Sequence, residues 1–153
     1  MPGHLARAFP AEALTAIEQA VKASETQHSG EIRFAVEAAL DARPLFAGQS
    51  ARERAIEVFS QLRVWDTEQN NGVLIYLLLA DRDVEIVADR GIHARVGARG
   101  WEDICRAMEA EFAQGRYREG VLLGVRSVTE QLARHFPPRP SDANELADKP
   151  ALL

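Results

Sequence analysis

An unbroken apolar run at residues 73–80 places the first limit on the fold of this chain. A strand with one solvent-facing side alternates apolar and polar residues, whereas a strand covered on both faces is apolar at every position. Eight apolar residues are also far fewer than the roughly twenty that a membrane-spanning helix needs. The run therefore predicts a central strand over residues 73–79 that helices cover on both sides, and it predicts no membrane span.

The patterns on either side of this run predict its neighbours. Before it, Ile32, Phe34 and Val36 alternate with polar or small residues, which indicates a strand with one buried face. After it, a tight turn at residues 80–82 leads into a third strand over residues 83–88. Apolar residues recur at helical spacing in four stretches, which are residues 10–28, 50–62, 101–115 and 117–136.

The predicted element order is therefore αβαββαα. A strand–helix–strand crossover implies that the first two strands pair in parallel through a right-handed connection, and the tight turn adds the third strand antiparallel. The fold class that follows is α/β, with a small mixed β-sheet flanked by helices on both faces. We predict that this single domain covers residues 9–136 and that residues 137–153, which begin with several prolines, form a flexible tail.

The charge pattern and the single cysteine exclude several classes of function. The formal net charge is −5, and the basic residues are interspersed rather than gathered, which argues against a nucleic-acid partner. Cys105 stands alone, so neither an internal disulfide nor a zinc site built on several cysteines is expected. Residues 1–10 contain no apolar segment of signal-peptide length. The cytoplasm is therefore the expected compartment.

Acidic and amide side chains gather at two places where a divalent cation could bind. At one end of the predicted sheet, Asp66 and Asn71 precede the second strand and Asp89 ends the third. Side-chain oxygens are the ligands that Ca2+ and Mg2+ prefer, so these three residues are the first choice for a metal site. Asp81 and Asp83, beyond the second strand, are the second choice. The alternative at both places is that these residues only cap helices and form turns.

No residue pattern assigns catalytic residues. Cys105 lies on an apolar helix face with Met108, which favours burial over a nucleophilic role, and Trp101 is expected to pack on the sheet from the same face. His93 lies in a predicted loop, where a solvated histidine is the ordinary outcome and a functional one the alternative. No glycine-rich turn follows a predicted parallel strand, so no dinucleotide cofactor is expected.

Several short segments, taken in order, resemble the TPM domain family. Residues 29–33 read SGEIR, like the family's GEIR strand start, and residues 71–75 read NGVLI, as in the family. Residues 81–86, DRDVEI, resemble its hairpin, and Phe112, Gly115, Tyr117 and Gly120 match its closing F..G.Y..G segment. The resemblance spans about residues 9–136 and is to the short bacterial members.

The resemblance implies an accessory or interaction module, because the family joins a thylakoid acid phosphatase, a photosystem II repair factor and a receptor modulator. It implies a protein partner, with a membrane-associated complex as one candidate. The alternative that it implies is a divalent-metal-dependent, phosphatase-like hydrolase with Ca2+ or Mg2+ as the cation. Asp89 and His93 depart from the family's G.GLE segment, so an activity that needs that glutamate is not carried over.

Overall fold

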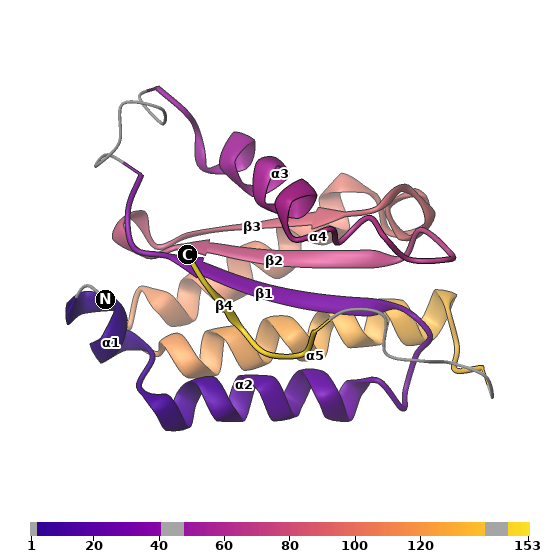
Figure 1. Cartoon of the computed structure of the whole chain (residues 1–153), viewed down its shortest axis with the longest axis horizontal. Helices are drawn as coiled ribbons and strands as arrows, with labels where there is room; N and C mark the ends of the chain where they lie inside the picture. The colour runs from indigo at the N-terminus through magenta and orange to yellow at the C-terminus, as the bar shows by residue number, and fades with distance from the viewer. Residues whose placement is uncertain (1–2, 41–47, 140–146) are drawn as a thin grey trace.

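The predicted central strand lies inside a four-stranded sheet. The computed structural model describes residues 3–40, 48–139 and 147–153. In it, β2 (Gly72–Leu78) pairs in parallel with β1 (Glu31–Glu37) and antiparallel with β3 (Asp83–Ala88). A short β4 (Ala151–Leu152) pairs in parallel with the other side of β1, which gives the order β3-β2-β1-β4 (Figure 1). The predicted parallel and antiparallel pairings are confirmed.

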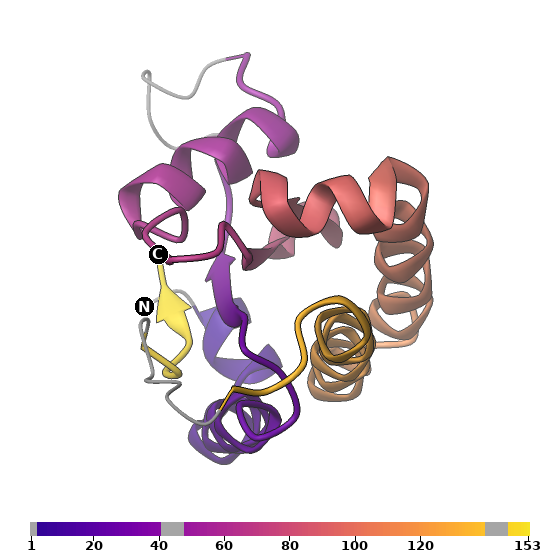
Figure 2. The ribbon, with the colours of Figure 1, turned by 90° about the vertical axis from the view of Figure 1, so that its right-hand side faces the viewer.

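Helices cover both faces of this sheet, as predicted. The helices are α1 (Gly3–Ala8), α2 (Ala11–Ser24), α3 (Ala51–Gln61), α4 (Arg90–Phe112) and α5 (Tyr117–His135). Seen along the strands, α3 lies on one side of the sheet, while α2 and α5 lie on the other and α4 runs alongside β3 (Figure 2). A mixed sheet between two helical layers is therefore the fold.

Alternate residues of β2 point into two separate hydrophobic cores. Ile75 and Leu77 belong to the larger core, which α2, α4 and α5 complete, and both are fully buried. Leu74 and Tyr76 face the other way and pack with Val58 of α3. Because both faces of β2 are buried, the strand needs an apolar side chain at every position, which explains the sequence run.

A buried ion pair fastens α3 to the sheet. The guanidinium of Arg54 donates from Nε to Oε1 of Glu37 in β1 at 2.8 Å, and the hydroxyl of Tyr76 donates to the same oxygen at 2.8 Å. Arg54 and Glu37 are both buried, and Arg54 also pairs with Glu57 on its own helix. Burial of an ion pair is tolerated because each charge keeps several hydrogen bonds.

Two local details differ from the sequence prediction. The turn after β2 is a short 3-10 helix, Leu79–Asp81, followed by Arg82 in the left-handed region with φ 52°. α4 begins at Arg90, so His93 lies on a helix and not in a loop. Asp89 caps this helix, and Gly97 interrupts it with φ 80° and ψ 161°, a conformation that glycine adopts without strain.

None of the helices in the described residues has the length and apolar composition needed to cross a membrane.

The prediction of a flexible tail over residues 137–153 is wrong for the last part of the chain. Ala151 and Leu152 pair with Ala35 and Val36, and the N–H of Leu153 donates to the carbonyl of Val36 at 2.9 Å. The outer edge of β1 offers backbone groups that any extended segment can pair with, and a short segment pairs without showing a periodic apolar pattern. The stretch 140–146 of the predicted tail lies outside the described residues.

Candidate functional site

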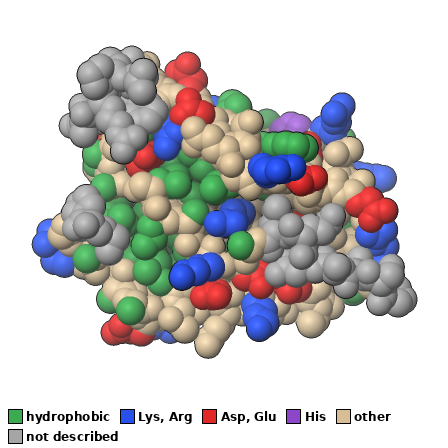
Figure 3. All heavy atoms as spheres, in the orientation of Figure 1, with side chains coloured by type: hydrophobic (Ala, Val, Ile, Leu, Met, Phe, Trp, Pro, Cys, Tyr) green, Lys and Arg blue, Asp and Glu red, His purple; other side chains and the backbone are tan. Residues whose placement is uncertain are grey.

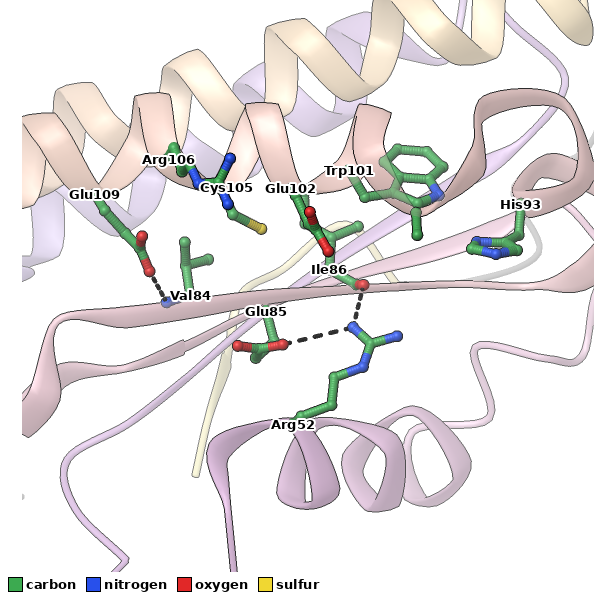
Figure 4. Close-up of a pocket in the computed structure, with 11 residues that line it drawn as sticks. Arg52, Val84, Glu85, Ile86, His93, Trp101, Glu102, Cys105, Arg106 and Glu109 are labelled. Carbon is green, nitrogen blue, oxygen red and sulfur yellow. Dashed lines mark hydrogen bonds and ion pairs between the residues drawn. The ribbon is translucent and has the colours of Figure 1, made fainter.

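A cavity of about 370 Å³ opens along the outer edge of β3, between α3 and α4. We call it the edge pocket. Its walls include Arg52 of α3, Glu85 and Ile86 of β3, and His93, Trp101 and Glu109 of α4 (Figure 4). The strand alternation sends Glu85 toward α3 and Ile86 toward α4, so the pocket extends over both faces of the strand.

Side chains from the two helices bind the outward backbone groups of β3. The guanidinium of Arg52 donates to the carbonyl of Ile86 at 2.7 Å. The carboxylate of Glu109 accepts the N–H of Val84 at 3.2 Å. An edge strand with unpaired backbone groups is a template for pairing with another chain, and charged side chains block that pairing. Arg52 and Glu109 therefore guard this edge.

Carboxyl groups crowd one end of the edge pocket. Burial, with added repulsion from the Asp83 carboxylate, raises the pKa of Glu85 from 4.5 to about 7. Burial also raises the pKa of Glu109. Arg52 lies 3.6 Å from Glu85 but its side chain is half exposed, so it offsets only part of this negative potential. A cation placed here would favour the charged form of Glu85.

Trp101 contributes a buried donor without an acceptor. The side chain is 4% exposed, which confirms the predicted burial, and its indole N–H has no hydrogen-bond partner. In Figure 4 the nitrogen lies on the side of the ring that faces β3 and His93. An unsatisfied buried donor costs about 1–3 kcal/mol. An oxygen of a ligand in the edge pocket could remove that cost.

Cys105 lines the same pocket but does not supply a nucleophile. The thiol is partly buried. Burial, with the nearby Glu85 and Glu109 carboxylates, raises its pKa to about 12, so the thiolate is a negligible species at neutral pH. The polar groups of the edge pocket are therefore arranged for binding rather than for thiol chemistry.

The first-choice metal residues share one end of the sheet. The N–H of Asp89 donates to the carbonyl of Gly72 at 2.9 Å, which places Asp89 beside the start of β2, and Asn71 precedes that strand. Asp66 lies in the preceding loop, exposed, and pairs with Arg63 at 3.1 Å. Within the part of the chain that the structure describes, these three side chains form no hydrogen bond with one another.

Asn71 and Asp89 each have a structural role there. Asn71 donates from Nδ2 to the carbonyl of Ser29 at 3.4 Å, and Asp89 accepts the N–H of Arg90 at 2.8 Å as the cap of α4. The amide oxygen of Asn71 and the second carboxylate oxygen of Asp89 are buried without a hydrogen-bond partner. Within residues 3–40, 48–139 and 147–153, no three His, Cys, Asp or Glu side chains are grouped as a metal site requires.

The second-choice residues, Asp81 and Asp83, lie at the opposite end of the sheet. Both line a cavity of about 470 Å³ beyond the carboxyl ends of β1 and β2. Ser50, whose hydroxyl caps α3 by accepting the N–H of Glu53 at 3.0 Å, is on the same wall. This is the position where open α/β sheets commonly bind ligands.

Sequence reasoning considered His93, Trp101 and Cys105 singly but missed the charged residues of the edge pocket. Arg52, Glu85 and Glu109 come from three different elements, so no local pattern joins them. The one available signal was Glu85, a carboxylate inside a short strand that is otherwise mostly apolar. Its neighbour across the ladder is Tyr76 in the buried β2, so an acid there lies next to the core.

Comparisons with known proteins agree on one family and fold. The TPM domain model matches residues 4–131. The BA42 protein from the psychrophilic bacterium Bizionia argentinensis, solved by NMR, is 30% identical with a TM-score of 0.81 over 95% of each chain. The N-terminal domain of a P. gingivalis protein is 20% identical with a TM-score of 0.66, over 84% of this chain and 81% of that one, and this second likeness concerns the fold alone. No curated protein matches the chain.

Proposed function

The chain belongs to the TPM domain family, and from that premise we propose that it is an accessory module that binds an extended segment of a partner protein in the edge pocket. The partner strand lies along β3 and carries a basic side chain. Binding by strand addition uses backbone hydrogen bonds for affinity and side-chain pockets for specificity.

The observation that carries this proposal is the unpartnered indole N–H of Trp101 beside a guarded strand edge. Arg52 and Glu109 hold single backbone groups of β3 through side-chain hydrogen bonds. An incoming backbone can replace both contacts with its own N–H and C=O groups and present a carbonyl to Trp101. The exchange keeps the buried polar groups of β3 satisfied.

The charge of the partner segment follows from the carboxyl groups at one end of the edge pocket. Burial and the neighbouring Asp83 carboxylate disfavour ionisation of Glu85, and the same two causes act on Glu109. A lysine or arginine side chain reverses that effect and holds Glu85 ionised. Binding of a basic segment therefore strengthens as the pH rises through about 7, where Glu85 loses its proton.

NMR titration with two matched peptides tests this function. The probes are blocked five-residue strand-forming peptides with lysine or glutamate at the central position. The lysine peptide is expected to shift the indole N–H signal of Trp101, while Trp65, whose Nε1 donates to the carbonyl of Ser60, serves as an internal reference. Equal shifts for both peptides, or none at millimolar peptide, would exclude a site selective for basic segments.

A pair of variants localises the effect. Glu85→Gln removes the carboxylate and is expected to weaken the lysine-peptide response and to abolish its rise with pH. Glu12→Gln makes the same change in charge on the exposed face of α2, away from the edge pocket, and should leave the titration unchanged. A loss in both variants would point to the overall charge rather than to this site.

A second candidate function is the divalent-metal-dependent, phosphatase-like hydrolase. It is favoured by the cavity that Asp81 and Asp83 line and by the unpartnered oxygens of Asn71 and Asp89 at the other end. Asp66, Asn71 and Asp89 stay the first choice for holding Ca2+ or Mg2+, and Asp81 and Asp83 the second. A bound cation would polarise a phosphate ester.

Calorimetry with calcium and then magnesium tests the metal site. Loss of binding in Asp89→Ala and Asp66→Ala is expected for the first-choice site, and loss in Asp81→Ala and Asp83→Ala for the second. Hydrolysis of p-nitrophenyl phosphate that a chelator abolishes is the expected catalytic result. Neither binding nor hydrolysis at millimolar cation would leave only the binding module.

The proposed setting is the cytoplasm, with a membrane-associated complex as a candidate partner. A chain with one cysteine forms no internal disulfide, which is usual for proteins of a reducing compartment. Fractionation of cells that express the tagged chain tests both points. Release from the membrane fraction by lysine peptides, but not by glutamate peptides, would connect the complex with the edge pocket.

A further inference from the structure

The outer edge of β1 is covered by the chain's own last residues. β4 pairs with two of the seven residues of β1, through Ala35 with Ala151 and Val36 with Leu152. Leu152 and Leu153 remain 45% and 38% exposed. The segment therefore makes few backbone hydrogen bonds and leaves its larger side chains in solvent, which are the features of a weakly held strand.

Hydrophobic side chains gather where this strand lies. In the orientation of Figure 1, β4 is in front and crosses the edge of β1, and the same face shows a cluster of hydrophobic side chains in the space-filling view (Figure 3). Ala151 packs against the core that α3 covers, whereas Leu152 and Leu153 are exposed. A second molecule on this face would bury apolar surface that the single chain leaves exposed.

A pair of carboxyl groups also joins the segment to the domain. Glu25, at the end of α2, hydrogen-bonds to Asp148, and it faces Glu31 and Lys22 as well. Asp148 also acts on Arg33 of β1. Burial and the neighbouring Asp148 raise the pKa of Glu25 to about 8, so Glu25 keeps its proton at neutral pH. When the proton leaves, the two negative charges repel each other.

We propose that residues 147–153 form an exchangeable strand, and that the segment of one copy occupies the β1 edge of a second copy in a dimer. The seat already fits this sequence, because exchange preserves the two ladder pairs, the bond from Leu153 to Val36 and the Glu25–Asp148 contact. An exchanged strand repeats native contacts between chains at low cost. Reciprocal exchange closes the dimer, and loss of the proton from Glu25 speeds the opening step.

The connecting chain is long enough for this exchange. Residues 136–150 join α5 to β4, and an extended chain of that length reaches at most about 50 Å. A tethered segment has an effective concentration of the order of millimolar at its own seat. The exchanged dimer therefore competes with the closed monomer at chain concentrations near about 1 mM and gives way to it near about 10 µM.

Photo-cross-linking between isotopically different copies tests the proposal. Unlabelled chain with benzoylphenylalanine in place of Leu153 is mixed with nitrogen-15-labelled chain of natural sequence. A mixed cross-link joins an unlabelled to a labelled chain, and an unmixed one contains unlabelled chain alone. Cross-links from position 153 to residues near Val36 are expected to be mixed and unmixed in comparable amounts at about 1 mM. At about 10 µM they are expected to be almost wholly unmixed. Placing the photo-reactive residue at Ala113, an exposed position at the end of α4, measures random collision.

Two outcomes would overturn the proposal. Cross-links to β1 that stay unmixed at about 1 mM would show that the segment never leaves its own chain. Mixed cross-links no more frequent than those from position 113 would show collision only. The expected pH dependence gives a further check, because mixing after combination of the two samples should be faster at pH 9 than at pH 6.5. Glu25→Gln can hydrogen-bond to Asp148 but has no proton to lose in this range, so it should remove that difference.

Discussion

The two edges of the sheet are covered in different ways. At β3, side chains from α3 and α4 bind single backbone groups, and a pocket remains between the helices. At β1, another stretch of backbone pairs with the strand directly. Both arrangements block the pairing of edge strands between molecules. They differ in what a partner has to displace: side chains at β3 and a whole segment at β1.

This difference teaches how one small sheet can offer two kinds of binding surface. The cover of β3 belongs to helices whose other residues are deeply packed, so the edge can be used without loss of the fold. The cover of β1 belongs to a segment with few contacts of its own, so its release alters little else. The predictions that follow test the stability expected at each edge.

The largest effect is expected when α3 loses its attachment to the sheet. Arg54→Ala leaves the carboxylate of Glu37 buried without its cation. The hydroxyl of Tyr76 is then the remaining side-chain donor to Oε1 of Glu37. Breaking one side of a buried ion pair destabilises proteins by about 3–5 kcal/mol. Chemical denaturation measures the loss. Arg63→Ala removes an exposed pair with Asp66 and should cost less than about 1 kcal/mol; equal losses would mean that Arg54 does not anchor the helix.

A smaller effect is expected when the cover of β1 is removed. Ending the chain after Arg139 deletes β4, with the hydrogen bond between Leu153 and Val36 and the buried Pro150. At about 0.5–1.5 kcal/mol for each hydrogen bond, the expected loss is about 1–2 kcal/mol with the fold retained. Thermal denaturation measures the loss of stability, and the dispersion of NMR signals shows whether the fold is retained. Unfolding of the shortened chain would show that β4 is as essential as the inner strands.

The next effect concerns the pH dependence of stability at the β1 edge. Glu25 has a folded-state pKa of about 8 against an ordinary value of 4.5, so the folded protein binds the extra proton. This contribution to stability is fully present below pH 4.5 and is lost as the pH rises through about 8. Glu25→Gln should therefore flatten the decline in unfolding free energy between these values. An unchanged profile would assign the decline to other groups, Glu85 first among them.

The smallest effect is expected at the β3 edge itself. Arg52→Ala removes a half-exposed side chain that binds the carbonyl of Ile86, and water can take its place. The free energy of unfolding should change by less than about 1 kcal/mol. Denaturation of this variant beside the chain shortened at Arg139 completes the comparison. A larger loss in Arg52→Ala than in the shortened chain would reverse the proposed order of the two edges.

The sequence predicted the centre of the fold better than its edges. The apolar run that contains β2 and the alternation of Ile32, Phe34 and Val36 are repeated patterns, and buried strands require them. β4 has two residues, too few for any period to show. Such a short segment becomes a strand because the edge of β1 is open for pairing. That open edge is a property of the folded sheet and not of the segment.

The candidate site was harder to predict for a related reason. Asp89 could have been recognised as a helix cap, because a helical stretch follows it directly. The edge pocket had no such signal, since its residues meet only after α3 and α4 pack beside β3. The metal hypothesis rested on residues that the loops bring to one end of the sheet. The distances between their side chains depend on the directions in which those side chains point, and sequence spacing does not determine these directions.

The position of β4 also bears on the order in which the molecule assembles. The pairings of β2 with β3 and of β1 with β2 join strands that are close in the sequence. Each therefore closes a much shorter loop than the pairing of Ala35 with Ala151. Contacts between distant residues are slow to form because closing a long loop costs entropy. The sheet can therefore be complete in its other three strands while the β1 edge is still open. Whether β4 docks on its own chain or on a neighbour is then settled in that last interval, by the local density of newly folded chains.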